Sequence, residues 1–466
     1  MVQQLSKSVA TLARMLREGK VTAATLAEEA IDNHARLGAR FNAYRTWDAT
    51  LIRRAAKAAD AALKSGGAAG PLHGLPVSLK DLFGATSYPT FAGSPTRLPE
   101  KWDREGPVVA ALRRQLAIVS GKAHTTEFAL GGTGVNIHWG TPRNPWSRGE
   151  HRSPGGSSSG AGVTLGEGSA VIAMGTDTGG SVRLPASFTG TVGLKITKGR
   201  WSTGGIVPLA TTLDTPGVLA RTVADAGYAF AALDPACLDA ERFADRLAGA
   251  RLSGVRLGID ERFMWDDLDP GIGEACRRAL RDAERKGASL VTVDFPDFEE
   301  GYRFSTKACI IRAEFQQFLD DELPEWWASL NPVAKRRVSG EASAVDYIRQ
   351  RAAMAGMNAA AEARLAGIDA LVLPTTPLTP PVIDDRLFNV EEGVRASAKS
   401  SRLTYPVSIL GLCALTVPVG LDAEGMPVGL QIVARSGGEE RLLEIGAALE
   451  HALGTARERL GPPPRR

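Results

Sequence analysis

The sequence predicts an α/β protein with a sheet covered by helices on both faces. Short apolar runs typical of buried strands alternate along the chain with longer segments that have helical periodicity. No internal repeat, low-complexity segment or Pro/Gly/Ser-rich linker divides the 466 residues into independent units. We therefore expect one large domain rather than several.

Residues 1–70 are expected to form a helical lead-in that packs on this domain. Leu12 and Leu16 lie at helical spacing, as do Leu26 and Ala30, which indicates amphipathic helices. The stretch "RRAAKAADAALKSGG" continues with strong helix formers and stops at its two glycines. Residues 5–64 are therefore predicted to be helical throughout.

The pattern changes at Pro71, where apolar runs begin. The predicted strands lie in residues 75–79, "LAIVSGKA", "SAVIAMGTD", "GVRLGID", "ASLVTVDF", "DALVLP" and "GLQIVA". Helical segments lie between them, and residues 300–350 are more helical, polar and aromatic than the rest. We expect residues 300–350 to form a possible cap over a site, and the basic end "RERLGPPPRR" to be a solvated, frayed tail.

The composition is that of an ordinary soluble protein, with 44% hydrophobic and 23% charged residues. Basic and acidic residues number 55 and 52, so the net charge of +3 gives no reason to expect nucleic acid or an anionic membrane as partner. No signal peptide or run of about 18 apolar residues is found. The four widely spaced cysteines, one of them Cys237, predict reduced thiols, and we expect a cytoplasmic protein.

Phosphate-binding glycine motifs and metal-ligand patterns are missing from the sequence. Neither GxxxxGK[ST] nor a GxGxxG that opens a helix after a strand occurs. No pair among the six histidines has metal-ligand spacing. We therefore predict no cofactor and no metal.

The stretch "SPGGSSSGAG" (153–162) places three serines between glycines. Its central residues formally fit G-x-S-x-G with Ser158 as the nucleophile. That pattern needs a strand before it and a histidine after it. The preceding residues are typical of a loop, and the only histidine after residue 151 is His451, in a predicted surface helix. A histidine-dependent serine hydrolase is therefore disfavoured.

Lys80 is a candidate base of another kind, because it ends the apolar run 75–79. Burial lowers the pKa of a lysine toward neutrality, and the neutral amine accepts protons. An exposed lysine at a strand end fits the same pattern, so the position alone leaves both interpretations open.

Three segments together resemble the amidase signature family: "GLPVSLKD" (74–81), "SPGGSSSGAG" (153–162) and "GTDTGGSVRLPASFTGTVGLK" (175–195). Ser157 and Ser181 are 24 residues apart, as in the family signature. Flanking segments such as "GTPRNPW" and "GMPVGLQIV" extend the resemblance over roughly residues 5–455. It implies a single α/β/α domain around a large, twisted, mixed sheet, with residues 71–455 as the catalytic domain and 456–466 as a tail.

The resemblance also implies a Ser–cis-Ser–Lys triad, with Ser181 as nucleophile, Ser157 as bridging serine and Lys80 as base. The oxyanion hole would consist of the N–H groups of Thr178, Gly179, Gly180 and Ser181. A cis peptide bond is expected between Gly156 and Ser157.

Other signature residues are expected to support this site. We expect Ser158 to hold the bridging loop or Lys80 by hydrogen bonds, Ser159 to be structural, and Asp177 and Arg183 to form a buried pair. Ser408 and Ala414 stand where relatives often carry Asn and Pro.

The implied function is hydrolysis of a small-molecule amide to an acid and ammonia or an amine. Ureas and carbamates stay open as substrates, and so does a homodimer. Phe91, Trp326 and Trp327 are candidates for contact with an apolar acyl group, although packing in the core or on the surface explains them equally well.

Two rival functions are weighed. The amidotransferase that acts on mischarged tRNA with glutamine as nitrogen donor has an amidase component with the same triad. That component typically reads "NMDEFA" where this chain has "AHTTEFA", and "IRQPAA" where this chain has "VRLPAS". A non-catalytic binding protein would not need Lys80, Ser157 and Ser181 together. A free amidase is therefore the favoured function.

Overall fold

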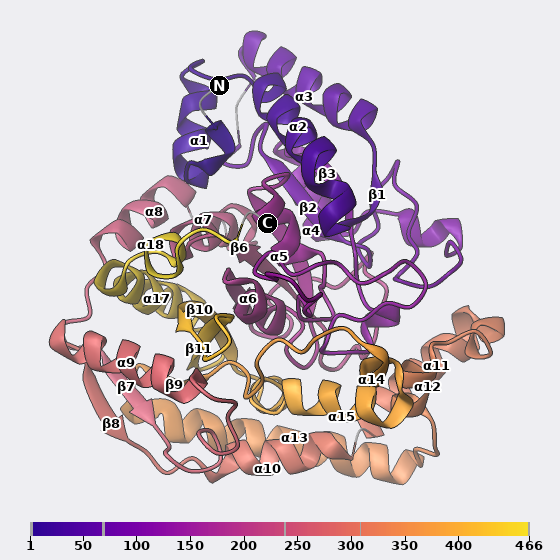
Figure 1. Ribbon diagram of the computed structural model, residues 1–466, viewed down its shortest axis with the longest axis vertical. Coiled ribbons are helices and arrows are strands. Elements are labelled where there is room, and N and C mark those ends of the chain that lie inside the picture. Colours follow the sequence, from indigo (N-terminus) through magenta and orange to yellow (C-terminus); the bar gives the residue numbers. More distant parts are fainter. Residues whose placement is uncertain (1–2, 68–69, 237–238, 308, 465–466) are drawn as a thin grey trace.

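A mixed sheet of 11 strands runs through the molecule (Figure 1). The computed structural model describes residues 3–67, 70–236, 239–307 and 309–464. In sheet order the strands are β1 (Tyr44–Trp47), β3 (Ile118–Ala123), β2 (Pro76–Lys80), β4 (Ile172–Asp177), β6 (Thr215–Ala220), β5 (Val192–Lys195), β10 (Cys413–Leu421), β11 (Pro427–Ala434), β9 (Ala370–Pro374), β7 (Arg256–Ile259) and β8 (Ser289–Thr292).

Strand direction divides this sheet into three parts. β3, β2 and β4 are parallel, and so are β9, β7 and β8 at the other end. The strands between β4 and β9 are antiparallel to their neighbours. Every residue of β2 and β4 is buried, as a strand between two helical layers requires.

Helices cover both faces of the sheet. Leu415 of β10 lies against Gly446 of α17 (Glu439–Leu453), whereas the next residue, Thr416, shares its side of the sheet with Ser187 of α6 (Arg183–Thr189). Because successive side chains of a strand point to opposite faces, α17 and α6 lie on opposite sides. The α/β fold with both faces covered is confirmed.

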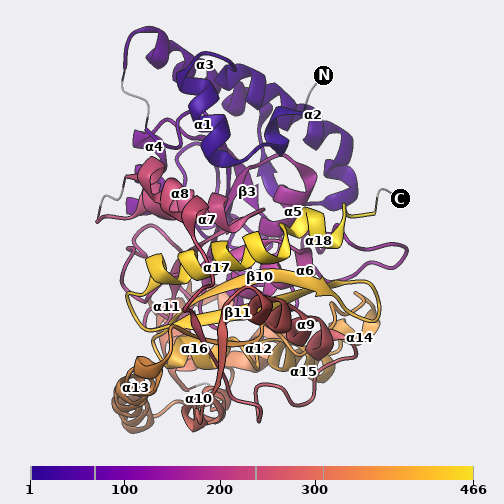
Figure 2. The same ribbon diagram turned by 90° about the vertical axis from the view of Figure 1, so that its left-hand side faces the viewer.

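The α17 layer also contains α7 (Val223–Leu233) and α9 (Ile272–Arg285), and α8 (Ala240–Gly249) packs on α7 and α17 (Figure 2). The α6 layer contains α5 (Ala161–Glu167), against which α2 (Ala23–Phe41) packs. The other helices of the amino-terminal half are α1 (Val9–Arg17), α3 (Ala49–Lys64) and α4 (Pro107–Arg114).

Residues 296–307 and 309–364 contain α10 (Pro296–Thr306), α11 (Cys309–Glu322), α12 (Pro332–Val338) and α13 (Ala344–Arg364), so the helical character expected of 300–350 is confirmed. Together with α14 (Asp385–Phe388) and α15 (Val390–Ser400) they lie at the lower end of the molecule in Figure 1, and α16 (Tyr405–Ile409) packs on α10. Phe315 and Phe318 of α11, with Trp326, surround Phe128 in the loop after β3. The helical segment therefore packs on a loop at the strand ends.

Two expectations about the chain ends are wrong. Residues 5–64 are not helical throughout, because β1 joins the sheet by antiparallel pairing with β3. The tail is not simply frayed, because α18 (Ala456–Leu460) begins with a capping box at Thr455 and buries Leu460 against Trp146 and Met426.

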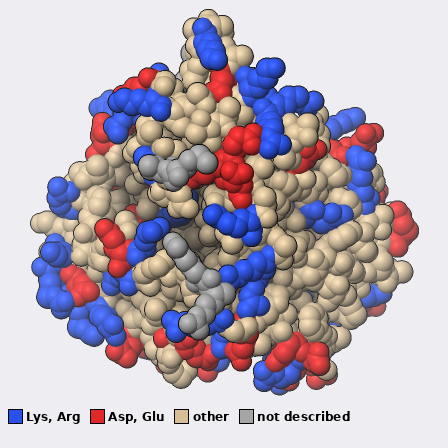
Figure 3. All heavy atoms as spheres, turned by 45° about the horizontal axis from the view of Figure 1, so that its top comes forward, with Lys and Arg blue, Asp and Glu red and all other residues tan. Residues whose placement is uncertain are grey.

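Charges of both signs are interspersed on the face shown in Figure 3. No helix within the described ranges is long and apolar enough to cross a membrane. Cys276, Cys309 and Cys413 are buried free thiols, and Cys237 lies outside the described residues.

Candidate active site

The site is built at the carboxyl ends of two parallel neighbours, β2 and β4. Leu79 of β2 pairs with Met174 of β4, so Lys80, the last residue of β2, reaches the same edge of the sheet as Thr176 and Asp177. Parallel strands bring their carboxyl ends together, and loops at that edge are where α/β proteins bind ligands.

Lys80 is fully buried. Its Nζ donates to Ser157 Oγ at 2.6 Å and to Thr176 Oγ1 at 2.7 Å. Burial lowers the pKa of Lys80 to about 7, and the negative charges of Asp214 and Asp177 only partly oppose this effect. The amine is therefore poised to take up and release a proton near neutral pH.

The Ser157 loop has the cis peptide bond that the family resemblance implies, between Gly156 and Ser157. The Gly156 N–H donates to Gly132 O at 2.8 Å, and Ser157 O accepts from the Thr126 N–H at 3.1 Å. Both backbone bonds hold the loop so that Ser157 Oγ faces Lys80.

Ser158 joins this loop to the segment around Ser181. Its hydroxyl donates to Thr176 O and its backbone N–H donates to Ser181 O, both at 3.3 Å. Ser159 Oγ is buried and has no hydrogen-bond partner among the described residues. Ser158 is thus a link between the two serine segments, whereas Ser159 fills space.

Ser181 precedes α6 and is 8% exposed. Within the described ranges, no hydrogen bond joins its Oγ to Ser157 Oγ, so the contact that a proton relay needs is not formed in this conformation. Nor do the N–H groups of Thr178, Gly179 and Ser181 donate to any other described residue. These three donors are free to bind an oxygen atom.

Gly180 differs from the other three expected oxyanion donors. Its N–H donates to Asp177 Oδ1 at 2.7 Å and is therefore already engaged. Its φ is +135°, and a Cβ there would lie 2.1 Å from Thr404 Oγ1. Gly180 is required by backbone conformation and by space.

Asp177 and Arg183 form a fully buried ion pair at 2.7 Å. Burial alone would raise the pKa of Asp177, but Arg183 and the backbone N–H of Val182 hold it below its usual value. Arg183 also donates to Gln431 and to Ser408, so the hydroxyl at the unusual position 408 contributes to this support. The pair fixes both ends of the segment that carries Ser181.

Three further groups around the site were not foreseen from the sequence. Thr176 accepts from Lys80, and Asp214 accepts from Thr178 Oγ1 at 2.6 Å. The ring of Tyr405 lies over Gly179, where a Cβ would be 3.1 Å away. Thr176 lies in the segment "GTDTGGS" (175–181), which is part of the family signature. No motif in the sequence near Asp214 indicates that this residue lies at the site.

The three aromatic candidates for the acyl pocket are engaged in packing. Phe91 lies edge-on to Trp139, and both rings flank the Arg45 guanidinium. Trp326 packs edge-on against Phe128, and Trp327 lies under Lys335.

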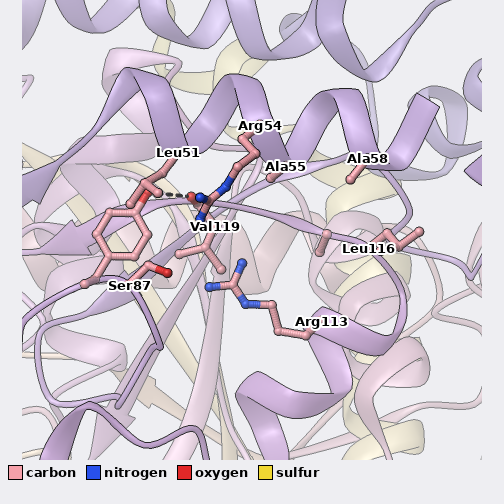
Figure 4. A pocket seen from close by; sticks show the side chains of 10 residues that line it. Leu51, Arg54, Ala55, Ala58, Ser87, Arg113, Leu116 and Val119 are labelled. Carbon is pink, nitrogen blue, oxygen red and sulfur yellow. Dashed lines mark hydrogen bonds between the residues drawn. The ribbon is translucent and has the colours of Figure 1, made fainter. Parts of the chain in front are cut away.

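A cavity of about 230 Å³ lies elsewhere, between α3, α4 and β3 (Figure 4). Leu51, Ala55, Leu116 and Val119 line it, with Arg113 at its side, and no residue of the expected triad takes part. This cavity is separate from the serine site.

The fold, the buried lysine and the two glycine-rich serine segments define the class of amidase signature enzymes. The Amidase family model matches residues 25–443, and the chain belongs to this family. It is accordingly an enzyme, a hydrolase of carbon–nitrogen bonds.

Two curated relatives illustrate the range of the family. The chain is 46% identical to 2-amino-5-chloromuconic acid deaminase of Comamonas testosteroni over 98% of both sequences. It is 32% identical to the A component of the glutamyl-tRNA(Gln) amidotransferase of Acidothermus cellulolyticus, over 98% of this chain and 96% of that one. A crystal structure of an amidase superposes with a TM-score of 0.83 at 33% identity, over 96% of this chain and 100% of the other.

Proposed function

We propose that the protein hydrolyses a carboxylic amide through an acyl-enzyme on Ser181, with Lys80 as the base acting through Ser157. The observation that carries this proposal is the bond from buried Lys80 Nζ to Ser157 Oγ at 2.6 Å. A lysine with a pKa of about 7 supplies neutral amine at physiological pH.

In the first step Ser181 Oγ attacks the amide carbon. Its proton passes to Ser157 Oγ while the Ser157 proton passes to neutral Lys80, because a hydroxyl donates and accepts at once. For this step the Ser181 side chain must turn toward Ser157. The reverse transfer protonates the leaving nitrogen, the C–N bond breaks, and ammonia or an amine departs.

Water then attacks the acyl-enzyme by the same relay and releases the acid. The N–H groups of Thr178, Gly179 and Ser181 are the donors proposed to bind the tetrahedral oxyanion. One preorganised donor of this kind contributes about 3 kcal/mol to transition-state stabilisation. Gly180 joins them only if its bond to Asp177 opens.

A fluorophosphonate probe and an ammonia-release assay over an amide panel test this mechanism. We expect labelling of Ser181 and loss of both labelling and turnover in Ser181→Ala. Ser159→Ala is the matched control, because Ser159 is buried in the bridging loop without a hydrogen-bond partner among the described residues. Labelling that survives in Ser181→Ala would overturn the assignment of the nucleophile.

A second candidate function is deamination of an unsaturated amino acid. It is favoured by the 46% identity to 2-amino-5-chloromuconic acid deaminase, whose substrate by its name is an amino-substituted acid. In such a substrate the nitrogen leaves from a carbon that is not an amide carbonyl, so no acyl-enzyme is required.

Hydroxylamine separates the two candidates. An acyl-enzyme transfers its acyl group to hydroxylamine and gives a hydroxamate, whereas deamination of a 2-amino unsaturated acid releases ammonia without a hydroxamate. Activity by the purified chain alone would also argue against a role as one component of an amidotransferase, which works within a complex.

A further inference from the structure

The cavity of about 230 Å³ in Figure 4 has the size and the lining of a site for a small molecule. It lies between α3, α4 and β3, and no residue of the candidate triad lines it. A cavity of about 150 Å³ with an aliphatic and aromatic lining takes up benzene. The volume here therefore suits a phenyl ring with a short side chain.

Most of the cavity wall is apolar. Leu51, Ala55 and Ala58 lie on one face of α3, because residues three and four apart are neighbours on a helix. Leu116, which follows α4, and Val119 of β3 line the cavity as well. A ligand that buries apolar carbon against this wall binds about fourfold more tightly for each methylene group removed from water.

Two arginines enter the cavity from different helices. Figure 4 shows Arg54 of α3 and Arg113 of α4 extending toward Val119 from opposite sides. Burial raises the pKa of the Tyr88 hydroxyl in the cavity wall. The positive charges of Arg113 and Arg54 partly oppose this rise, so both guanidinium groups lie near the same hydroxyl.

These two arginines are unequally paired. Arg113 Nε donates to Glu105 Oε1 at 3.0 Å, and Arg113 Nη2 donates to Thr86 O at 3.4 Å. Arg54 makes no hydrogen bond and no ion pair with a described residue. The Asp48 carboxylate, which also acts on Tyr88, caps α3 and lines no part of the cavity. Two guanidinium groups and one paired carboxylate leave one positive charge at the cavity, which matches a monoanion.

Two lining residues occupy backbone positions where glycine is usual. Ser87 has a φ of +85° in the turn that is closed by the Tyr88 N–H donating to Ala85 O at 2.9 Å. Leu116 has a φ of +56° just after α4, where its N–H donates to Arg113 O at 2.9 Å. Both positions therefore present a side chain to the cavity although glycine would be less strained there.

We propose that this cavity binds a small monocarboxylate with an apolar body, such as an arylalkanoate, whose carboxylate lies between Arg54 and Arg113. A guanidinium pairs with a carboxylate by two parallel N–H···O bonds. The Ser87 hydroxyl, which bonds to no described residue, is a further donor, and Figure 4 shows it turned toward the Arg113 side chain. The apolar body lies against the wall formed by α3 and Leu116. This inference does not depend on the proposed function.

The charge is tested with Arg54→Gln and its matched control Arg53→Gln. Arg53 is the neighbouring residue of α3 and is paired with Glu28 outside the cavity. In calorimetric titrations with 3-phenylpropanoate, Arg54→Gln should bind at least about tenfold more weakly than the wild type, because it loses hydrogen bonds to a charged group. Arg53→Gln should stay within about twofold of the wild type. Equal binding by Arg54→Gln and the wild type would overturn the proposal, as would no binding at about 10 mM ligand.

The space is tested with Ala55→Leu, which fills the cavity and leaves both arginines in place. Ala61→Leu adds the same atoms at an exposed position of α3 outside the cavity and serves as the control. Ala55→Leu should weaken binding of 3-phenylpropanoate at least about tenfold, since each lost methylene contact costs about fourfold. Unchanged binding in Ala55→Leu would show that the anion is held on the surface, and it would refute the proposal.

The two halves of the ligand are tested separately in the wild-type protein. The alcohol 3-phenylpropan-1-ol keeps the apolar body without the charge, whereas acetate keeps the carboxylate without the apolar body. Each should bind at least about tenfold more weakly than 3-phenylpropanoate. Equal binding of the alcohol would contradict the role of the arginines, and equal binding of acetate would contradict the role of the apolar wall.

Should Arg54→Gln fail to fold, the wild-type protein still gives an answer. Phenylglyoxal modifies accessible guanidinium groups, and tandem mass spectrometry of the peptides distinguishes neighbouring arginines. At ligand concentrations that saturate the calorimetric titration, 3-phenylpropanoate should protect Arg54 and leave Arg53 reactive. If Arg54 reacts as fast with the ligand as without it, the carboxylate is not bound there.

Discussion

Lowering the pH should inactivate this enzyme by protonating Lys80. The protonated amine cannot accept the proton of Ser157, so activity falls as pH drops through the pKa of Lys80, which burial lowers to about 7. With that pKa the neutral fraction is about 9% at pH 6, 50% at pH 7 and 91% at pH 8. Between pH 6 and 8, kcat/KM should therefore rise about tenfold and approach a plateau.

A lysine with the ordinary pKa of 10.5 would give a different profile. Its neutral fraction would rise about a hundredfold between pH 6 and 8, and no plateau would appear. The assay is continuous ammonia release at subsaturating substrate, in buffers of constant ionic strength. The plateau is therefore the diagnostic feature.

Lys80→Ala should reduce kcat/KM by a factor of about 10²–10⁴. It should also abolish the acid limb, which is the fall of kcat/KM as the pH drops below about 7. Lys195→Met is the matched control, because burial lowers the pKa of Lys195 to about 8 although its Nζ only donates to backbone carbonyls. If this control folds, its acid limb should be unchanged. An acid limb that persisted in Lys80→Ala would refute the assignment of Lys80 as the base.

Three further changes test the surroundings of the site. Thr176→Val removes one of the two acceptors of the Lys80 ammonium, so the acid limb of kcat/KM should move down by about one pH unit; movement to higher pH would contradict this. Gly180→Ala should reduce kcat at least about tenfold, because its Cβ would collide with Thr404. The control is Gly437→Ala, at a position that also has positive φ but has open space around it. That control should lower the free energy of unfolding by only about 1 kcal/mol. Asp177→Asn should lower the free energy of unfolding in urea by about 3–5 kcal/mol, because it leaves Arg183 buried without its anion. The control is Asp294→Asn in the exposed pair with Arg262, which should cost at most about 1 kcal/mol. Equal losses in the two variants would show that the buried pair contributes no more to stability than the exposed pair.

Much of the sheet could be predicted because its strands are short apolar runs. β2, β4 and β9 are buried over every residue, and such runs are visible without an alignment. β5, β6 and β10 were not predicted, because glycine and proline interrupt the apolar pattern in "VGLK", "TPGVLA" and "CALTVPVGL". β1 has only four residues between two long helices and obtains its pairing from β3, which local sequence cannot show.

The residues of the candidate site also fall into two groups, those that the sequence predicts and those that it does not. Lys80, Ser157 and Ser181 lie in contiguous motifs whose spacing is read directly from the sequence. Asp214 lies in no motif and reaches the site through tertiary packing alone. The engagement of the Gly180 N–H by Asp177 depends on backbone direction, which residue types do not specify. Motifs therefore predict the groups that we propose to react, whereas the charges that surround them are found only in the structure.

Among the described residues, three lysines of the sheet are fully buried, and the partners of each lysine determine whether it can act as a base. Lys122 lies 3.2 Å from the Asp81 carboxylate, which favours its charged form. Lys122 also donates a hydrogen bond to the Thr90 hydroxyl. That hydroxyl donates its own proton to Trp102 O, so it is not oriented to give the proton to Lys122.

Lys195 donates to the carbonyls of Leu412 and Ile196, and a carbonyl has no proton to give. Lys80 alone among these three meets only hydroxyl groups, on Ser157 and Thr176, and neither hydroxyl donates a hydrogen bond to another described acceptor. Burial lowers the pKa of all three, but only Lys80 is joined to a group that can deliver a proton to it. We therefore expect the hydroxyl partner, rather than the shifted pKa, to distinguish the proposed base Lys80 from the other two buried lysines.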